Sequence, residues 1–188
     1  ALVLLSGAGK DLDLEHNPSV IDFFSSFDTK SHLTIITFLL IGTVITCIVQ
    51  SSAAVMAITI LLCSTGVLPI YLGIALVMGE NIGTTATANL AALGANAQAR
   101  RAALAHLVFN VFGVIWVLCL FYPFVNFVCS LVGYNPDGNM SAAQKATLLP
   151  IVLAMFHTCF NVCNTAVLIW FIPQIEKLVC QLIKPKAD

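Results

Sequence analysis

The sequence has very few charged side chains. Only 9% of its 188 residues are Asp, Glu, Lys or Arg, whereas 59% are hydrophobic and the mean hydropathy is +0.97. A soluble domain carries about 25% charged residues. The chain therefore lacks the polar surface that a water-facing globule needs. This composition excludes a soluble enzyme, a disordered chain and a basic nucleic-acid binder, and it indicates an integral membrane protein.

Two long stretches are almost free of charge. Glu80 is the only charged residue in 31–99, and none lies in 146–175. A helix that crosses the hydrocarbon core of a bilayer needs about 20 apolar residues. We therefore expect an all-α, multi-pass protein of the cell membrane (inner or plasma membrane).

Metal-binding and redox signatures are also missing. None of the seven cysteines forms a C-x-x-C pair, so neither a zinc site nor a thiol-redox site is indicated. We interpret the cysteines as small apolar residues that pack between helices. No Lys or Arg lies between Lys30 and Arg100. An anion bound at membrane depth in this segment would have to be held by neutral donors and bound cations.

The distribution of apolar and polar segments predicts four parts. The sequence lacks an initiator Met, and residues 1–7 read as the end of a helix, so we interpret the chain as the later portion of a longer protein or a processed piece. The predicted parts are 1–32, the end of a preceding helix and a polar external loop with a short amphipathic helix around 20–27; 33–97, a re-entrant hairpin plus a broken helix; 98–174, two transmembrane helices; and 175–188, a cytoplasmic tail.

The hairpin is predicted from length. Its arms, 33–49 and 53–63, flank Gln50, Ser51 and Ser52 and, with the polar residues that end them, cover about 34 residues. Two full crossings need about 40. A re-entrant hairpin with these three residues at its tip fits better, although serines in membrane helices often serve only as helix contacts. Ser51 or Ser52 would cap the second arm.

The next segment, 67–97, predicts one crossing made of two half-helices. Its centre reads Glu80-Asn81-Ile82-Gly83-Thr84-Thr85, which we expect to be unwound, with Thr84 or Thr85 capping the second half-helix. Two helix N-termini that face one point can hold an anion. Unwound carbonyls and hydroxyls nearby can bind Na⁺, as in transporters with broken helices. Glu80 is either a cation or proton partner or an interfacial residue at a half-helix end.

A short motif occurs twice in the second half of the chain. His106 and Asn110 lie in HLVFNV, and His157 and Asn161 lie in HTCFNV. Residues four apart share a helix face, so each pair should point into the helix bundle. The pairs would form an interhelical hydrogen-bond clasp or, alternatively, a proton relay or substrate contact.

Two full spans are predicted after the broken helix. The first covers 102–122, with a kink or stop at Pro123, and the second covers 151–172 and is bounded by Pro150 and Pro173. The positive-inside rule places Arg100, Arg101 and the lysines of the tail in the cytoplasm. The 133–145 loop and residues 10–32 would then face the outside.

Together these segments resemble the type II sodium/phosphate cotransporter family. The resemblance rests on Q-S-S at 50–52, G-E-N-I-G-T-T at 79–85, and R-R-A-A-L-A-H at 100–106 followed by Phe109 and Asn110. It is strongest over 50–113. It implies two inverted repeats, each with a re-entrant hairpin that carries a Q-S-S-S motif, with substrate and Na⁺ where the repeats meet. The G-E-N form makes this chain similar to the second repeat.

The resemblance has two departures. The third serine of the motif is Ala53, and only one Q-S-S occurs in the chain. The first repeat would have to lie upstream in the full-length chain, in another chain or in a homodimer partner.

On this basis we expect half of a secondary transporter that takes up inorganic phosphate with Na⁺ as coupling ion, with no other cofactor or metal. The expected substrate ligands are Ser51, Ser52, Asn81, Thr84 and Thr85. The expected sodium ligands are Gln50, Ser52, Asn81 and Thr85. The expected polar support comes from Glu80, His106, Asn110, His157 and Asn161.

Other function classes stay open. A transporter of another small oxyanion would use the same site, a channel would conduct without saturating, and a sensor or assembly module would bind no ligand in an ion-dependent way. An enzyme is not expected, because Ser51 has no evident base in its own segment, although His106 or His157 could approach it in space.

Overall fold

The computed structural model describes residues 18–184, and every regular element in that range is helical. The predicted all-α class is confirmed for this part of the chain, whereas the helix end expected at 1–7 lies outside the described residues. The helices are α2 (Pro18–Ser25), α3 (His32–Val49), α4 (Ser52–Ser64), α5 (Ile70–Ala91), α6 (Ala97–Cys119), α7 (Phe121–Val132), α8 (Ala142–Leu168) and α9 (Ile172–Leu182), with 3₁₀ turns η1 (Ala92–Gly94) and η2 (Ile169–Phe171).

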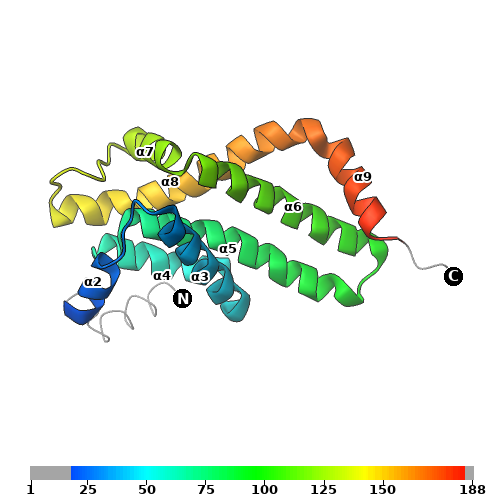
Figure 1. The fold of residues 1–188 in the computed structure, drawn as a ribbon, viewed down its shortest axis with the longest axis horizontal. Coiled ribbons are helices and arrows are strands. Elements are labelled where there is room, and N and C mark those ends of the chain that lie inside the picture. The colour runs from blue at the N-terminus through cyan, green and yellow to red at the C-terminus, as the bar shows by residue number, and fades with distance from the viewer. Residues whose placement is uncertain (1–17, 185–188) are drawn as a thin grey trace.

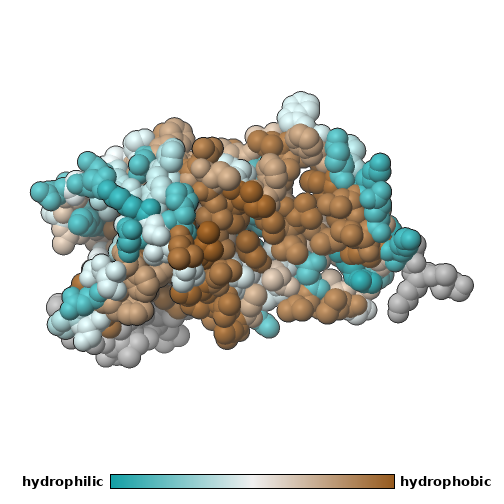
Figure 2. Space-filling model, viewed as in Figure 1, coloured by the Kyte–Doolittle hydropathy of each residue, from teal (hydrophilic) through white to brown (hydrophobic). Residues whose placement is uncertain are grey.

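Three helical segments are long and apolar enough to cross a membrane. They are His32–Val49, Ala97–Cys119 and Ala142–Leu182, the last of which comprises α8, η2 and α9. Figure 2 shows a broad apolar band between two polar ends of the molecule. This distribution is that of a helical membrane protein whose long axis runs between two aqueous faces.

The two predicted hairpin arms are helices. α3 ends at Val49 and α4 begins at Ser52, so the polar triplet provides the connection. α3 packs against α5 and runs parallel to it, because Leu39 and Thr43 lie against Gly79 and Thr46 lies against Gly83. α4 runs antiparallel to α5. In Figure 1 the α3–α4 connection lies well short of the end that carries the α5–α6 connection and α9.

The predicted break in the next segment is wrong. α5 is one continuous helix from Ile70 to Ala91. The glycines that suggested unwinding are packing sites, because a Cβ at Gly83 would lie 2.7 Å from both Thr43 O and Thr46 Cβ of α3. The hydroxyl of Thr84 donates to Glu80 O at 2.9 Å, within its own helix. Thr84 therefore caps no second half-helix, and Thr85 caps none either.

The later spans differ from the prediction at their ends. α6 ends at Cys119 and α7 begins at Phe121, which agrees with the kink predicted at Pro123, since proline cannot donate to the carbonyl four residues earlier. Pro150 does not open a span but lies inside α8, which begins earlier, after a capping box at Ser141. Pro173 lies in the first turn of α9, where its missing N–H costs nothing, so most of the expected tail is helical.

The structure places the charged segments at two opposite ends (Figure 1). At one end the Tyr122 hydroxyl donates to Thr29 O at 3.0 Å, which ties the α2–α3 loop to α7 beside the 133–141 loop. At the other end the Arg101 guanidinium donates to Ile183 O at 2.9 and 3.0 Å. The described part of the 10–32 segment and the 133–145 loop therefore share one end, and Arg101 and Ile183 share the other.

Candidate functional site

The connection between α3 and α4 is a sharp turn with an exposed helix N-terminus. Gln50 adopts the left-handed conformation with φ 54°, and its backbone N–H donates to Thr46 O at 2.8 Å. Ser51 is the N-cap of α4, and its Oγ accepts from Ala54 N at 3.3 Å. The predicted cap is thus confirmed. The first backbone N–H groups of α4 and its positive dipole end point out at this turn.

A buried carboxyl group lies between α4 and α5. Glu80 is 2% exposed and accepts a hydrogen bond from the Thr59 hydroxyl at 3.2 Å. It lies in the interior of the continuous α5, so its alternative interpretation as an interfacial residue at a helix end is wrong. Burying an acid at this depth is costly, and intramembrane acids are mostly functional.

The register of α4 on α5 shows where the α3–α4 turn lies along α5. Thr59 lies against Glu80, and Cys63 lies near Gly73, so the helices are antiparallel. Ser52 is two turns before Thr59 on the same stripe of α4. Ser52 therefore lies beyond the level of Glu80, toward the C-terminal end of α5. That the hairpin residues and those of α5 form one site stays a prediction.

Two polar groups in this region have no partner among residues 18–184. They are the hydroxyl of Thr46, which is 1% exposed, and the side-chain nitrogen of Asn81, whose atom is buried. Unsatisfied buried donors are rare in proteins. The Asn81 amide thus has the free donor that the predicted role requires. Thr85, in contrast, is fully buried and its hydroxyl donates to Ile82 O at 2.8 Å.

The predicted histidine–asparagine clasp is wrong in detail. Asn110 and Asn161 donate to His106 O and His157 O at 3.2 and 2.8 Å, each within its own helix. His106 and His157 are both exposed rather than turned into the bundle. The physical reason is local. An asparagine side chain can bond to the carbonyl four residues before it in the same helix, so it needs no partner on another helix.

The actual clasp between α6 and α8 uses Asn164, which the sequence analysis did not single out. Its Nδ2 donates to Phe109 O at 2.8 Å, and its Oδ1 accepts from Trp116 Nε1 at 3.3 Å. A Cβ at Gly113 would collide with Asn164 and Phe160. A usable signal exists in the sequence: Asn164 takes the place in the second copy of the motif that Gly113 takes in the first.

Thr59, which donates to Glu80, was also not predicted as a functional residue. A single threonine in an apolar helix does not by itself indicate a functional site. Its spacing of seven residues from Ser52, which places both on one side of the helix, was the available signal.

These features define the class first: a helical membrane protein with a polar turn between α3 and α4 and a buried acid between α4 and α5. The chain belongs to the Na⁺/Pi-cotransporter family, whose family model matches residues 25–133. The resemblance seen in the sequence is thereby confirmed. The family is one of transporters rather than enzymes, and its transported species are phosphate and sodium.

Several curated proteins are similar to the chain. It is 36% identical over 117 residues to YqeW, an uncharacterized protein of Bacillus subtilis (strain 168), covering 62% of this chain and 37% of that protein. It is 28% identical over 149 residues to YjbB of Escherichia coli (strain K12), whose name assigns it provisionally to inorganic phosphate export, covering 79% and 25%. It is 40% identical over 89 residues to the human Sodium-dependent phosphate transport protein 2B, covering 45% and 12%.

The chain thus matches only 12 to 37% of the length of these relatives. No solved structure matches it with significance.

Proposed function

We propose that the chain is one half of a secondary transporter that carries inorganic phosphate into the cell together with Na⁺. Family membership supports phosphate as the transported ion. The observation that carries the mechanism is the α4 N-terminus, capped by Ser51 and opening at a turn inside the apolar band. A helix N-terminus binds phosphate through backbone N–H groups and its dipole, with no formal positive charge.

In this proposal the phosphate lies against the first turn of α4. Ser51 and Ser52 contribute hydroxyl donors, the free amide of Asn81 adds a third donor, and Thr84 lines the same face. Because α5 is unbroken, the anion site has one helix N-terminus from this chain and needs a second contribution. The hydroxyl of Thr85 is already used within its helix, so its assignment stays a prediction.

Sodium compensates the anion, since no Lys or Arg lies in 31–99. The proposed ligands are the side-chain oxygens of Gln50, Ser52 and Asn81, hard donors of the kind that Na⁺ prefers. The hairpin acts as the moving part: re-entrant in the membrane, it exposes the bound ions to one side and then to the other.

A second repeat completes the site. It lies in the same full-length protein, in another chain or in a second copy of this chain in a homodimer. The large apolar side chains that α3 exposes support the presence of a covering surface of lipid or protein. They include Leu33, Leu40, Val44 and Ile48.

The test is uptake of labelled phosphate into proteoliposomes that contain the protein, with an inward Na⁺ gradient and with K⁺ in its place. We expect saturable uptake with Na⁺ only. Ser51→Ala should abolish uptake without preventing membrane insertion, whereas Ser130→Ala, an exposed serine of α7, should transport normally. Equal uptake with Na⁺ and K⁺ contradicts the coupling, and normal uptake by Ser51→Ala contradicts the site.

Export is the second candidate, because the provisional name of YjbB assigns that direction to a relative. The same vesicles, loaded with phosphate and given an outward Na⁺ gradient, distinguish transport directions. Competition by arsenate or sulfate defines the selectivity among oxyanions. Failure of all gradients together with absence of Na⁺-dependent phosphate binding identifies a non-transporting sensor or assembly module.

A further inference from the structure

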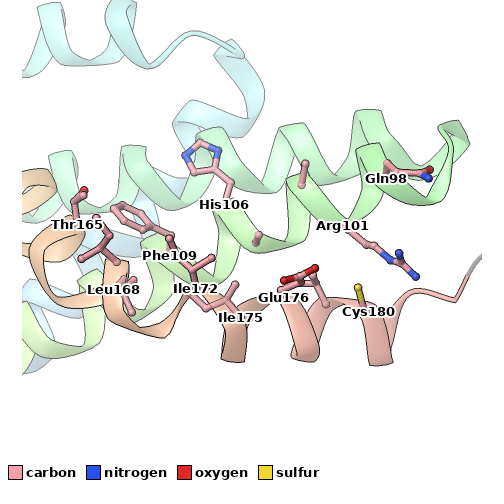
Figure 3. Close-up of a pocket in the computed structure, with 14 residues that line it drawn as sticks. Gln98, Arg101, His106, Phe109, Thr165, Leu168, Ile172, Ile175, Glu176 and Cys180 are labelled. Atoms are coloured by element: carbon pink, nitrogen blue, oxygen red, sulfur yellow. The ribbon is translucent and has the colours of Figure 1, made fainter.

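A hollow lies between α6, the end of α8 and α9, far along the chain from the α3–α4 hairpin. It is a cavity of about 790 Å³ whose walls are almost entirely apolar. The walls are formed by Ala105, Phe109, Leu168, Ile172, Ile175 and Val179. Figure 3 shows Phe109 of α6 beside Leu168, Ile172 and Ile175 at the end of α8 and on α9. Its size falls within the range of about 300–1,000 Å³ typical of small-molecule sites.

One end of this hollow is basic. Arg101 lines it directly, Arg100 lines a neighbouring hollow together with Ile183, and Lys184 follows Ile183 in the chain. We call Arg100, Arg101 and Lys184 the basic cluster. Glu176 is the one acid in the lining, so these four residues together carry a net charge of +2 (three bases minus one acid).

The arginine at the mouth has donors to spare. Arg101 uses Nε and one Nη to bind Ile183 O, which caps the C-terminal end of α9. A guanidinium has five N–H donors. The remaining donors can bind an oxygen of an anionic group beside the cap.

The hollow also opens within the apolar band. Figure 2 shows apolar surface continuing over α6 and α9 up to a polar edge at the α9 end. α9 itself is amphipathic: Ile172, Ile175 and Val179 face the hollow, whereas Lys177 is exposed. Amphipathic helices of this kind lie at the boundary between headgroups and acyl chains.

We propose that this hollow binds one anionic phospholipid from the cytoplasmic leaflet. An acyl chain lies between α6 and α9, and the phosphate of the headgroup lies at the basic cluster. Basic pockets between membrane helices on the cytoplasmic side bind anionic headgroups in this way. The hollow thus differs from the transport site both in place and in ligand, and the proposal stands whether or not the chain transports phosphate.

The experiment measures lipids that remain bound to the purified protein. The protein is reconstituted with equal amounts of phosphatidylglycerol and phosphatidylcholine, re-extracted in mild detergent and examined by native mass spectrometry. We expect one phosphatidylglycerol retained per chain. Excess inorganic phosphate should not displace it, because the acyl chain holds the lipid. Displacement by phosphate would instead assign the cluster to the free ion and overturn the proposal.

Two variants test the two halves of the site. Arg100→Ala combined with Lys184→Ala should lower the preference for phosphatidylglycerol by about 25-fold, since each basic residue near a headgroup is worth about fivefold in binding. Lys145→Ala, at the opposite end, should not change it. Arg101 is left intact because it also caps α9.

Ala105→Phe fills the hollow and should remove the retained lipid, whereas Ala154→Phe, on the exposed side of α8, should retain it. Equal retention of both lipids by the wild-type protein, or lipid still bound to Ala105→Phe, overturns the proposal. So does a dimer mass without lipid, which would place a second copy in the hollow.

Discussion

Thr59 and Glu80 form a buried hydrogen-bonded pair between α4 and α5, with 3.2 Å between Thr59 Oγ1 and Glu80 Oε1. The same hydroxyl lies 3.0 Å from Val55 O. One hydroxyl proton cannot serve two acceptors fully. If the Glu80 carboxyl is protonated, its O–H can donate to Thr59 Oγ1 while the Thr59 hydroxyl donates to Val55 O, so that both contacts are satisfied at once.

The first prediction follows from this geometry. Glu80→Gln supplies an N–H donor in the place of the carboxyl proton, so it should change the free energy of unfolding by less than about 1 kcal/mol. Glu80→Ala leaves a cavity and should cost about 2 kcal/mol. Thermal unfolding in detergent measures both. If Glu80 binds a cation during transport, Glu80→Gln should also slow phosphate uptake at least tenfold. A Gln variant as unstable as the Ala variant would contradict a protonated carboxyl.

The second prediction separates the backbone of Gln50 from its side chain. Its φ of 54° costs a residue with a Cβ about 1–2 kcal/mol. Gln50→Gly should therefore fold at least as stably as the wild-type protein and yet lose phosphate uptake, because the amide is gone. Gln50→Asn tolerates the same backbone and should keep partial uptake. Normal uptake by Gln50→Gly would show that the residue only shapes the turn.

The two helices α3 and α4 and the turn between them were predictable because local rules decide them, whereas the re-entrant course of this hairpin stays a prediction. The lengths of two apolar runs and a serine before the second predicted α3, α4 and the Ser51 cap. The positions of the arginine pair at 100–101 and of the tail lysines predicted which segments lie at the same end of the molecule. None of these inferences needs to know which helix packs against which.

The course of α5 was not predictable in this way. A run with two glycines and two threonines can unwind, or it can form a groove for a neighbouring helix, and the choice depends on the partner. Here α3 lies in that groove, where the Thr43 hydroxyl donates to Gly79 O at 3.1 Å. Asn164 was missed for the same reason, since its role exists only once α6 and α8 are in register.

The third prediction tests the packing of α3 on α5. A Cβ at Gly79 would collide with Leu39 O and Thr43 N. Gly79→Ala should therefore lower the free energy of unfolding by about 1–3 kcal/mol, and Gly83→Ala should do the same. The matched control is Gly94→Ala, because nothing lies within 4 Å of its added Cβ. Melting temperatures of the three variants compare them directly, and a Gly79→Ala protein as stable as the Gly94→Ala protein would contradict the close approach.

The fourth prediction concerns the clasp between α6 and α8. Asn164→Ala removes the donor to Phe109 O and leaves the indole N–H of the half-buried Trp116 without this acceptor. We expect a loss of about 1–2 kcal/mol, in the upper range for hydrogen bonds between membrane helices. Asn161→Ala is the control, since Asn161 bonds only to its own helix and should cost far less. Combining Asn164→Ala with Trp116→Phe completes a double-mutant cycle. A coupling energy of about 0.5 kcal/mol or more is expected for residues in contact, and additive effects would show that the indole and the amide do not stabilise each other.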